Sequence, residues 1–184
     1  MNLNSIPNIN LDLIAQKGRV DKSDIVGDFG CGQGYLTKIL CKRVTDSGMV
    51  YSVDIIRDVL SSLETILHIE GINNFKTIWS NMEIYNATKI DSKSLDAGFL
   101  VNILSQSSKE FEVIREAARM VKIGGKIVIA DWTKTAISPI APIDEDRVDI
   151  QKIRKLCEKI PEVVEEEIFV AGENYWGIVL NVVN

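Results

Sequence analysis

The residues with the clearest chemical potential form a glycine-rich turn near the start of the chain. Residues 26–34 read VGDFGCGQG, an apolar run that leads directly into an amphipathic stretch. Gly30, Gly32 and Gly34 let the backbone turn tightly and let a ligand lie against bare main chain. Asp28 stands two positions before the first of these glycines and places a carboxylate beside the turn. A glycine turn between a strand and a helix is typical of sites that bind a nucleoside cofactor.

Two classes of cofactor fit such a turn, dinucleotides and S-adenosylmethionine. The dinucleotide fingerprint GxGxxG needs a third glycine at position 35, where this chain has Tyr35. The dinucleotide fingerprint also has an apolar residue at the position that Asp28 occupies here, because a carboxylate there would face a pyrophosphate. A carboxylate suits a cationic ligand, such as the amino group or the sulfonium of S-adenosylmethionine. The turn therefore favours S-adenosylmethionine, and a glycine turn without a ligand is the alternative. The turn residues predicted to bind it are Asp28, Gly30, Cys31, Gly32 and Gly34.

Polar residues at the ends of two further predicted strands extend this site. Asp54 follows the second strand, 20 residues after Gly34, where the strand end meets the glycine turn. Its carboxylate can accept two hydrogen bonds from a ribose diol, with Ile55 beside it. Asn81 and Met82 follow the third strand and suit the edge and the face of an adenine. An Asx turn at Asn81 is an alternative of nearly equal weight.

Candidate catalytic residues follow the fourth and fifth strands, and none is assigned a definite role. Asn102 lies at the mouth where the transferred methyl group is expected, although it could instead hold its loop. Asp131 and Trp132 point to the same rim, where Trp132 either walls the acceptor pocket or covers the end of the sheet. The only histidine, His68, lies in a helix away from these strand ends, so it is a poor candidate for a general base.

Short strands alternating with helices predict a parallel sheet covered on both faces. Strands are predicted at 25–29, 50–53, 75–80, 95–101 and 126–130. Helices are predicted at 35–44, 57–70 and 109–121, with Gly71 and Gly124–Gly125 as left-handed caps. The last quarter of the chain predicts a loop at 137–143, a helix at 145–159, and strands at 166–170 and 176–182 joined by the turn 171–175. The predicted fold is α/β: a doubly wound, mostly parallel seven-stranded sheet with an antiparallel C-terminal hairpin.

One domain over 1–184 is expected from the length. Its parts are an N-terminal cap (1–24), a cofactor-binding core (25–132) and a C-terminal helix and hairpin (133–184). Hydrophobic residues make up 46% and charged residues 26% of the chain, which is typical of a globular protein.

Charge and cysteine content exclude several classes of function. A net charge of −5 disfavours binding to nucleic acid or to an anionic membrane. The three cysteines lack a CxxC pair, so they predict neither a disulfide framework nor a metal site, and a reducing cytoplasm is expected. The first residues have no basic and apolar leader pattern.

Five segments carry a family resemblance: DFGCGQGYLT, VYSVDI, SNMEIY, LDAGFLVNILSQ and EAARMVKIGGKIVIADW. The chain resembles Rossmann-like (class I) S-adenosylmethionine-dependent methyltransferases, and more narrowly the small-molecule and ubiquinone-biosynthesis-type group. The resemblance implies an enzyme that transfers a methyl group by in-line displacement. It also implies that the counterparts of six residues line the cofactor site, namely Asp28, Gly30, Gly32, Asp54, Asn81 and Asn102. Many members have Asp where this chain has Asn81.

A small-molecule acceptor is expected. Enzymes that methylate amide or exocyclic amino nitrogens carry Asp/Asn-Pro-Pro-Tyr/Phe after the fourth strand, whereas residues 102–105 here read NILS. The loops 137–143 and 3–13 are expected to form a partial lid. A homodimer could complete the pocket, although no sequence feature indicates one. A non-catalytic S-adenosylmethionine-binding module is the alternative function, and a nucleotide-dependent reductase is a weaker one.

Overall fold

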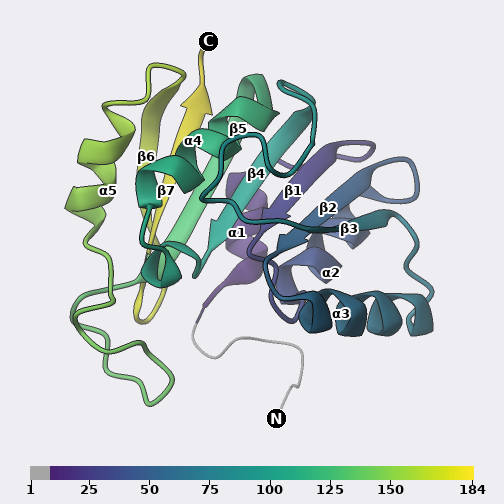
Figure 1. Cartoon of the computed structure of the whole chain (residues 1–184), viewed down its shortest axis with the longest axis horizontal. Helices are drawn as coiled ribbons and strands as arrows, with labels where there is room; N and C mark the ends of the chain where they lie inside the picture. The colour runs from purple at the N-terminus through teal and green to yellow at the C-terminus, as the bar shows by residue number, and fades with distance from the viewer. Residues whose placement is uncertain (1–8) are drawn as a thin grey trace.

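The structure, a computed structural model, describes residues 9–184 and is built on one seven-stranded sheet in the order β3-β2-β1-β4-β5-β7-β6 (Figure 1). The first five strands pair in parallel, whereas β7 pairs antiparallel with both β5 and β6. This arrangement confirms the predicted mostly parallel sheet with an antiparallel hairpin. The strands are β1 (Ile25–Phe29), β2 (Met49–Asp54), β3 (Phe75–Trp79), β4 (Leu95–Val101), β5 (Val121–Trp132), β6 (Val163–Gly172) and β7 (Tyr175–Val182).

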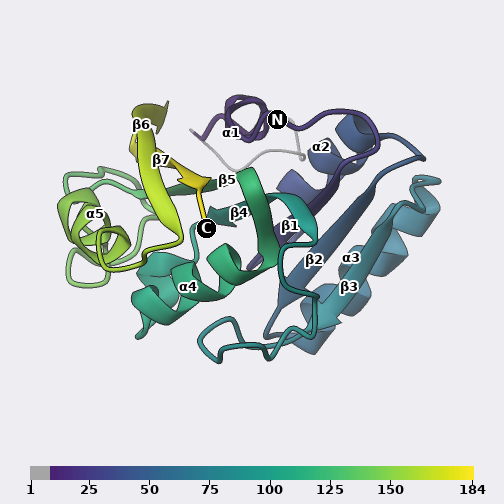
Figure 2. The ribbon, with the colours of Figure 1, turned by 90° about the horizontal axis from the view of Figure 1, so that it is seen from above.

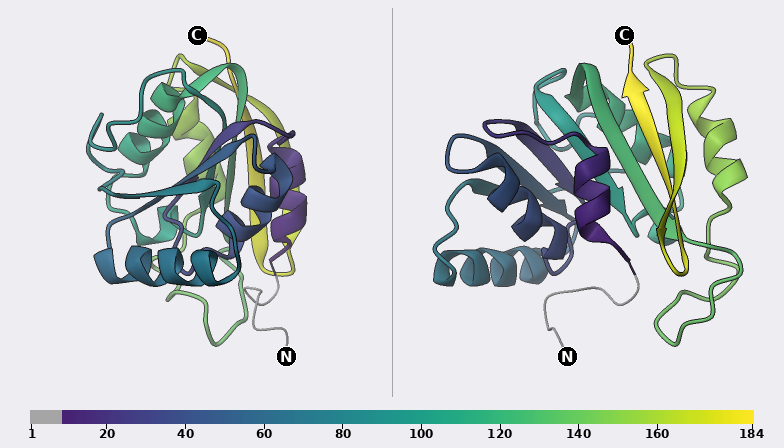
Figure 3. Two further views of the ribbon diagram at one scale, coloured as in Figure 1. Left: turned by 90° about the vertical axis from the view of Figure 1, so that its right-hand side faces the viewer. Right: turned by 180° about the vertical axis from the view of Figure 1, so that it is seen from behind.

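Helices cover both faces of the sheet (Figures 2 and 3). One face carries α1 (Leu11–Lys17), α2 (Tyr35–Val44) and α3 (Arg57–Ile69), and the other carries α4 (Glu110–Met120) and α5 (Ile150–Cys157). Side chains alternate between the two sides along each strand, so Phe99 and Leu100 enter separate hydrophobic cores. No helix within residues 9–184 has the length and apolar character needed to cross a membrane.

The connection from β3 to β4, residues 80–94, crosses the face of the sheet without forming a helix (Figure 1). A buried ion pair on α4 holds this connection in place: Arg119 donates to Glu116 through Nε and Nη2, both at 2.9 Å. The Glu116 carboxylate also accepts bonds from the amide of Asn86 and the hydroxyl of Thr88. The segment after β3 is therefore anchored to the helix layer through α4.

Several predicted boundaries in the second half of the chain are wrong. The strand expected at 166–170 spans Val163–Gly172 and takes in part of the expected turn 171–175. The helix expected at 145–159 spans only Ile150–Cys157, because Asp149 caps it: its carboxylate accepts a bond from the amide of Gln151. The helix expected at 109–121 ends at Met120, and Gly124–Gly125 lie inside β5 rather than capping a helix. β5 therefore starts five residues earlier than the apolar run 126–130 indicates.

The N-terminal segment differs from the expected loop. Residues 3–8 of the proposed lid lie outside the described part of the chain. Ile9 pairs with Gly172 at the edge of the hairpin, and Leu11 begins α1, whose buried side joins the core beneath β5. The Asn10 side chain caps this helix by accepting a bond from the Leu13 amide. Residues 9–13 are thus part of the packed fold.

Candidate active site

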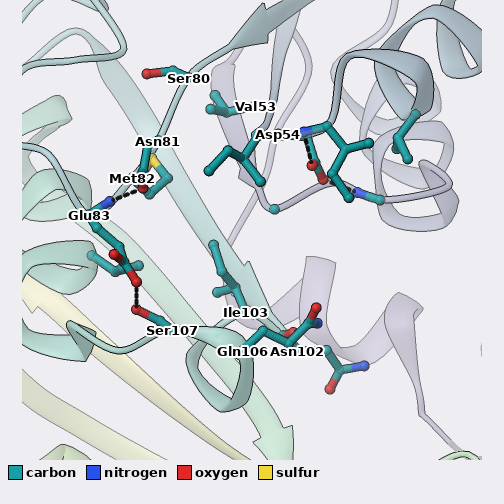
Figure 4. Close-up of a pocket in the computed structure, with 16 residues that line it drawn as sticks. Val53, Asp54, Ser80, Asn81, Met82, Glu83, Asn102, Ile103, Gln106 and Ser107 are labelled. Atoms are coloured by element: carbon teal, nitrogen blue, oxygen red, sulfur yellow. Dashed lines mark hydrogen bonds between the residues drawn. The ribbon is translucent and has the colours of Figure 1, made fainter.

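Seven of the ten residues predicted to bind the cofactor line one pocket at the carboxyl ends of β1, β2, β3 and β4, whereas Asp28, Cys31 and Gly34 lie outside its lining (Figure 4). It has a volume of about 340 Å³. Neither the loop 137–143 nor the segment 9–13 contributes to its lining. The lining comprises Gly30, Gly32, Val53, Asp54, Ile55, Ile56, Val59, Ser80, Asn81, Met82, Glu83, Asn102, Ile103, Gln106, Ser107 and Val113.

The glycine turn forms one wall of this pocket. The amides of Gly30 and Cys31 both donate to the carbonyl of Val53, which fixes the turn against the end of β2. Gly30, Gly32 and Gly34 have φ values of 74°, 49° and 74°, which side chains rarely adopt. A Cβ added at Gly32 would meet no atom within 4 Å, so main chain faces the pocket there. Gly34 lies outside the lining and packs against α3.

Asp54 is the charged side chain best placed to bind a ligand. Its carboxylate Oδ2 accepts a bond from the Gly32 amide at 3.0 Å, and Oδ1 accepts one from the Ile56 amide at 2.9 Å. These bonds fix the carboxylate at the pocket wall, and each oxygen keeps a second lone pair that can accept a further hydrogen bond. Two such acceptors are complementary to a vicinal diol.

Asp28 does not line the pocket, contrary to the expectation that its carboxylate faces the ligand. It is buried beneath the turn, where Oδ2 accepts a bond of 2.6 Å from the Thr37 hydroxyl on α2. Burial raises the pKa of Asp28 from 3.8 to about 6, and the Thr37 hydrogen bond offsets part of this effect. The Asp28 carboxylate does not contact the pocket, so it can act on a bound ligand only through its electrostatic potential.

Cys31 is also outside the lining. Its thiol is buried, and burial raises its pKa far above the ordinary range. A protonated thiol is a poor nucleophile, so this environment suits a small packed residue.

Asn81, Met82 and Glu83 form the wall opposite the glycine turn. The Asn81 side chain accepts a bond from the amide of Glu83 at 2.8 Å, which is the Asx turn weighed as the alternative. It still lines the pocket, beside the buried side chain of Met82. Glu83 reaches across to the start of α4, where its carboxylate accepts bonds from the Ser107 hydroxyl at 2.7 Å and the Ser108 amide at 3.0 Å (Figure 4).

The three candidate catalytic residues have different environments. Asn102 lines the pocket and has a positive φ of 56°. Asp131 is fully buried, and its two oxygens accept bonds from the amides of Ser105 and Trp132, so it serves to hold the chain after β4 against β5. Trp132 is buried against Tyr175, with ring centroids 4.2 Å apart, and does not line the pocket. Of these three, only Asn102 meets the pocket.

Several lining residues had no place in the sequence prediction. Ile56 caps α3 and Val59 lies in its first turn, so both follow directly from the strand end that carries Asp54. Ile103, Gln106 and Ser107 lie around the short 3₁₀ helix Leu104–Gln106, which carries no recognisable pattern. Their spacing from Asn102 was the only available signal.

The lining suits a nucleoside bearing an amino-acid group. Gly32 offers exposed main chain, Asp54 offers paired acceptors for a ribose, and Met82 offers a flat apolar surface for a base. Apolar side chains of Ile55 and Ile56 continue this surface along the rim. The residues present therefore fit S-adenosylmethionine.

Comparison with known proteins identifies the family. Residues 21–183 match the family model described as "Methyltransferase domain", so the chain belongs to that family. The predicted class, an S-adenosylmethionine-dependent methyltransferase with a Rossmann-like fold, is thereby confirmed. A search of curated protein sequences finds no significant match.

Solved structures with low sequence identity share the fold. An S-adenosylmethionine-dependent methyltransferase from Aquifex aeolicus is 18% identical, with a TM-score of 0.85, and the match covers 95% of this chain and 90% of that one. A geranyl diphosphate methyltransferase in complex with S-adenosylmethionine is 13% identical, with a TM-score of 0.77 and coverages of 94% and 84%. An rRNA methylase from Streptococcus thermophilus is 18% identical, with a TM-score of 0.65 and coverages of 95% and 94%.

Proposed function

We propose that this methyltransferase binds S-adenosylmethionine in the pocket at the carboxyl edge of the sheet and methylates a small-molecule acceptor. The observation that carries the proposal is the geometry of Asp54. Its carboxylate is fixed by the amides of Gly32 and Ile56 and keeps two acceptor sites at the pocket wall. A ribose diol is the group that this arrangement complements.

The chain contributes binding and alignment to the reaction. Asp54 holds the ribose, Met82 packs against the base, and the main chain at Gly32 accommodates the amino-acid end. Asp28 adds a negative potential beneath the turn, which favours a cationic ligand. When bound, S-adenosylmethionine supplies a methyl group already activated for displacement, so a general base is optional where the acceptor atom is already nucleophilic. Holding two reactants in line can contribute roughly 7–11 kcal/mol to lowering the barrier.

Charge supports a small-molecule acceptor over a nucleic acid. A net charge of −5 disfavours a polyanionic partner, and NILS at 102–105 lacks the paired prolines of enzymes that methylate exocyclic amines. The fold alone does not decide, because the structural neighbours include one named for geranyl diphosphate and one named for rRNA. A nucleic-acid acceptor is therefore one outcome to be tested.

Two further expectations belong to this proposal. A homodimer that completes the pocket stays a prediction. We place the enzyme in the cytoplasm, because Cys31, Cys41 and Cys157 are all free and buried.

The proposal is tested first by calorimetry with S-adenosylmethionine and S-adenosylhomocysteine. Asp54→Ala removes the ribose acceptors and should weaken binding roughly 10- to 150-fold. The exposed Asp58, four residues further on in α3, provides the matched control as Asp58→Ala. Circular dichroism of each variant confirms folding, because Asp54 also supports two backbone amides. Equal affinity in the three proteins would rule out the assigned ribose contact.

The acceptor is tested by S-adenosylhomocysteine release with a library of alcohols, phenols, amines and thiols, and with total RNA in parallel. Turnover with a small molecule, and none with RNA, supports the proposal. Turnover that needs RNA would replace it with nucleic-acid methylation.

A further inference from the structure

β3 is an edge strand of the sheet, and its outer side pairs with no strand of residues 9–184. It lies at the rim of the molecule, beside α3 (Figure 2). The N–H and C=O groups that point outwards from such an edge form a template for pairing with another strand. The opposite edge strand, β6, carries three consecutive glutamates at 165–167, and its end pairs with Ile9. β3 is therefore the more open of the two edges.

The surface is hollowed on both sides of this edge. A cavity of about 650 Å³ lies on the face of the sheet that α4 covers, where Tyr51 and Ile78 line it. A second cavity, of about 390 Å³, lies on the other face and is lined by Glu64 of α3. Lys76 and Thr77 of β3 line both cavities. Side chains alternate between the faces of a strand, so a strand added at this edge has room for its side chains on both.

The sequence of β3 is complementary to itself. Residues 75–79 read FKTIW, and antiparallel pairing of two copies about a two-fold axis at Thr77 uses all five residues. Phe75 then faces Trp79 of the second copy, and Lys76 faces Ile78. Thr77 faces Thr77 of the second copy. Aromatic pairs and threonine pairs stabilise antiparallel strands, and this register sets no like charges opposite each other.

Two side chains of β3 are arranged in a way that suits a partner at this edge. Trp79 is 56% exposed, although its indole donates to the Ile55 carbonyl at 2.8 Å and its ring lies 3.7 Å from the Arg57 guanidinium. Exposed tryptophan and arginine side chains are enriched at protein interfaces. A lysine often protects an edge strand, but the Lys76 ammonium lies over its own sheet, 5.9 Å from the Tyr51 ring. Lys76 therefore leaves the edge open.

Charge on α3 also suits a second copy. Arg57 lies at the edge through its contact with Trp79, and Glu64 lies two turns further along the helix, in the groove beside β3. A two-fold axis through the strand pair keeps both copies of α3 on one face of the joined sheet and makes them antiparallel. Arg57 of each copy is then directed towards Glu64 of the other, so the two surfaces have complementary charges.

We propose that the chain forms a homodimer in which two β3 strands pair antiparallel about Thr77 and join the two seven-stranded sheets into one. The inference is independent of the proposed reaction. A strand of five residues gives a small interface, so we expect a dissociation constant between about 1 µM and about 1 mM. The dimer would form next to the cofactor pocket, because Trp79 is bonded to Ile55 of its lining.

The first test is sedimentation equilibrium of the full chain from about 10 µM to about 1 mM, the range that the expected affinity requires. The mean mass should rise towards twice that of one chain. Thr77→Glu sets two carboxylates opposite each other beside Glu64, so it should weaken dimerisation about fivefold or more. Thr135→Glu is the matched control, because it makes the same change at an exposed threonine after β5 and should dimerise like the wild type. Circular dichroism confirms that each variant is folded.

The second test locates the two-fold axis by disulfide formation. All three native cysteines are buried, so Thr77→Cys adds one accessible thiol. Opposed residues of an antiparallel pair have Cβ atoms about 4.5–5.5 Å apart, so mild oxidation should link Thr77→Cys into dimers much faster than Thr135→Cys. A wild-type protein that stays monomeric, a dimer that is unchanged by Thr77→Glu, or equal rates of disulfide formation in the two cysteine variants would each overturn the inference.

Discussion

Asp28→Asn provides a stringent test of the electrostatics beneath the glycine turn. The wild-type carboxylate is buried and bonded to the Thr37 hydroxyl at 2.6 Å. Asparagine has nearly the same shape, and its amide oxygen can accept the same hydrogen bond. The substitution therefore removes the charge and keeps the packing. We expect Asp28→Asn to be more stable than the wild type at neutral pH, and to bind the cationic cofactor less tightly.

The size of the stability effect follows from the pKa of Asp28. The pKa of this group is 3.8 when unperturbed and about 6 in the folded protein. The folded state therefore binds the proton more tightly, so stability is greatest at low pH and is lost as the pH rises from about 4 to about 6. A difference of about 2 pKa units corresponds to about 3 kcal/mol at pH 7.5. For a chain of this length that is a rise in Tm of about 6–12 °C.

The assay is thermal and urea unfolding of both proteins between pH 4 and pH 8. The difference between them should be largest above pH 7 and should shrink towards pH 4, where the Asp28 side chain of the folded wild type is neutral. Asp12→Asn is the control, because the Asp12 side chain is 77% exposed and its substitution removes an equal charge at the surface. An Asp28→Asn protein that is less stable at pH 7.5, or a difference independent of pH, would refute the buried-charge account.

Two further predictions concern the framework of the site. Arg119→Ala leaves the Glu116 carboxylate buried and unpaired, so the free energy of unfolding measured in urea should fall by about 3–5 kcal/mol. Arg115→Ala breaks an exposed ion pair, and the free energy of unfolding should fall by less than about 1 kcal/mol. Similar losses would mean that the buried pair does not anchor the β3–β4 connection. Gly34→Ala should lower Tm more than Gly32→Ala, because the new Cβ would overlap a leucine of α3. Gly32→Ala should weaken S-adenosylmethionine binding more than Gly34→Ala does, since the new Cβ would project from the pocket wall. If calorimetry shows weaker binding in Gly34→Ala than in Gly32→Ala, the placement of Gly32 at the pocket wall is contradicted.

Much of the sheet could be predicted because the signals are local. β1 and α2 meet at a turn whose three left-handed residues are all glycine, and Gly71 has the expected positive φ after α3. Asp54 could be placed because a strand end and its distance from the turn are both readable in sequence. The start of α5 was misplaced, since the cap at Asp149 is one of several acidic residues in that segment.

The remaining features depend on contacts between distant parts of the chain. The sequence does not indicate that Thr37 would hold Asp28 inside the protein, away from the pocket. Tyr175 meets Asn102 only through the β5–β7 register, which no local pattern specifies. The partnership of Glu116 with the β3–β4 connection joins segments 28 to 30 residues apart. Each of these three contacts is determined by tertiary packing rather than by the local secondary-structure propensity of the residues involved.

The Ser107 hydroxyl and the Ser108 amide both donate to the Glu83 carboxylate, so the segment after β3 is tied to the segment before α4 at the pocket wall. Loss of this tie in Glu83→Ala would free the two segments to move apart, and exchange of a bound nucleoside would then be expected to become faster.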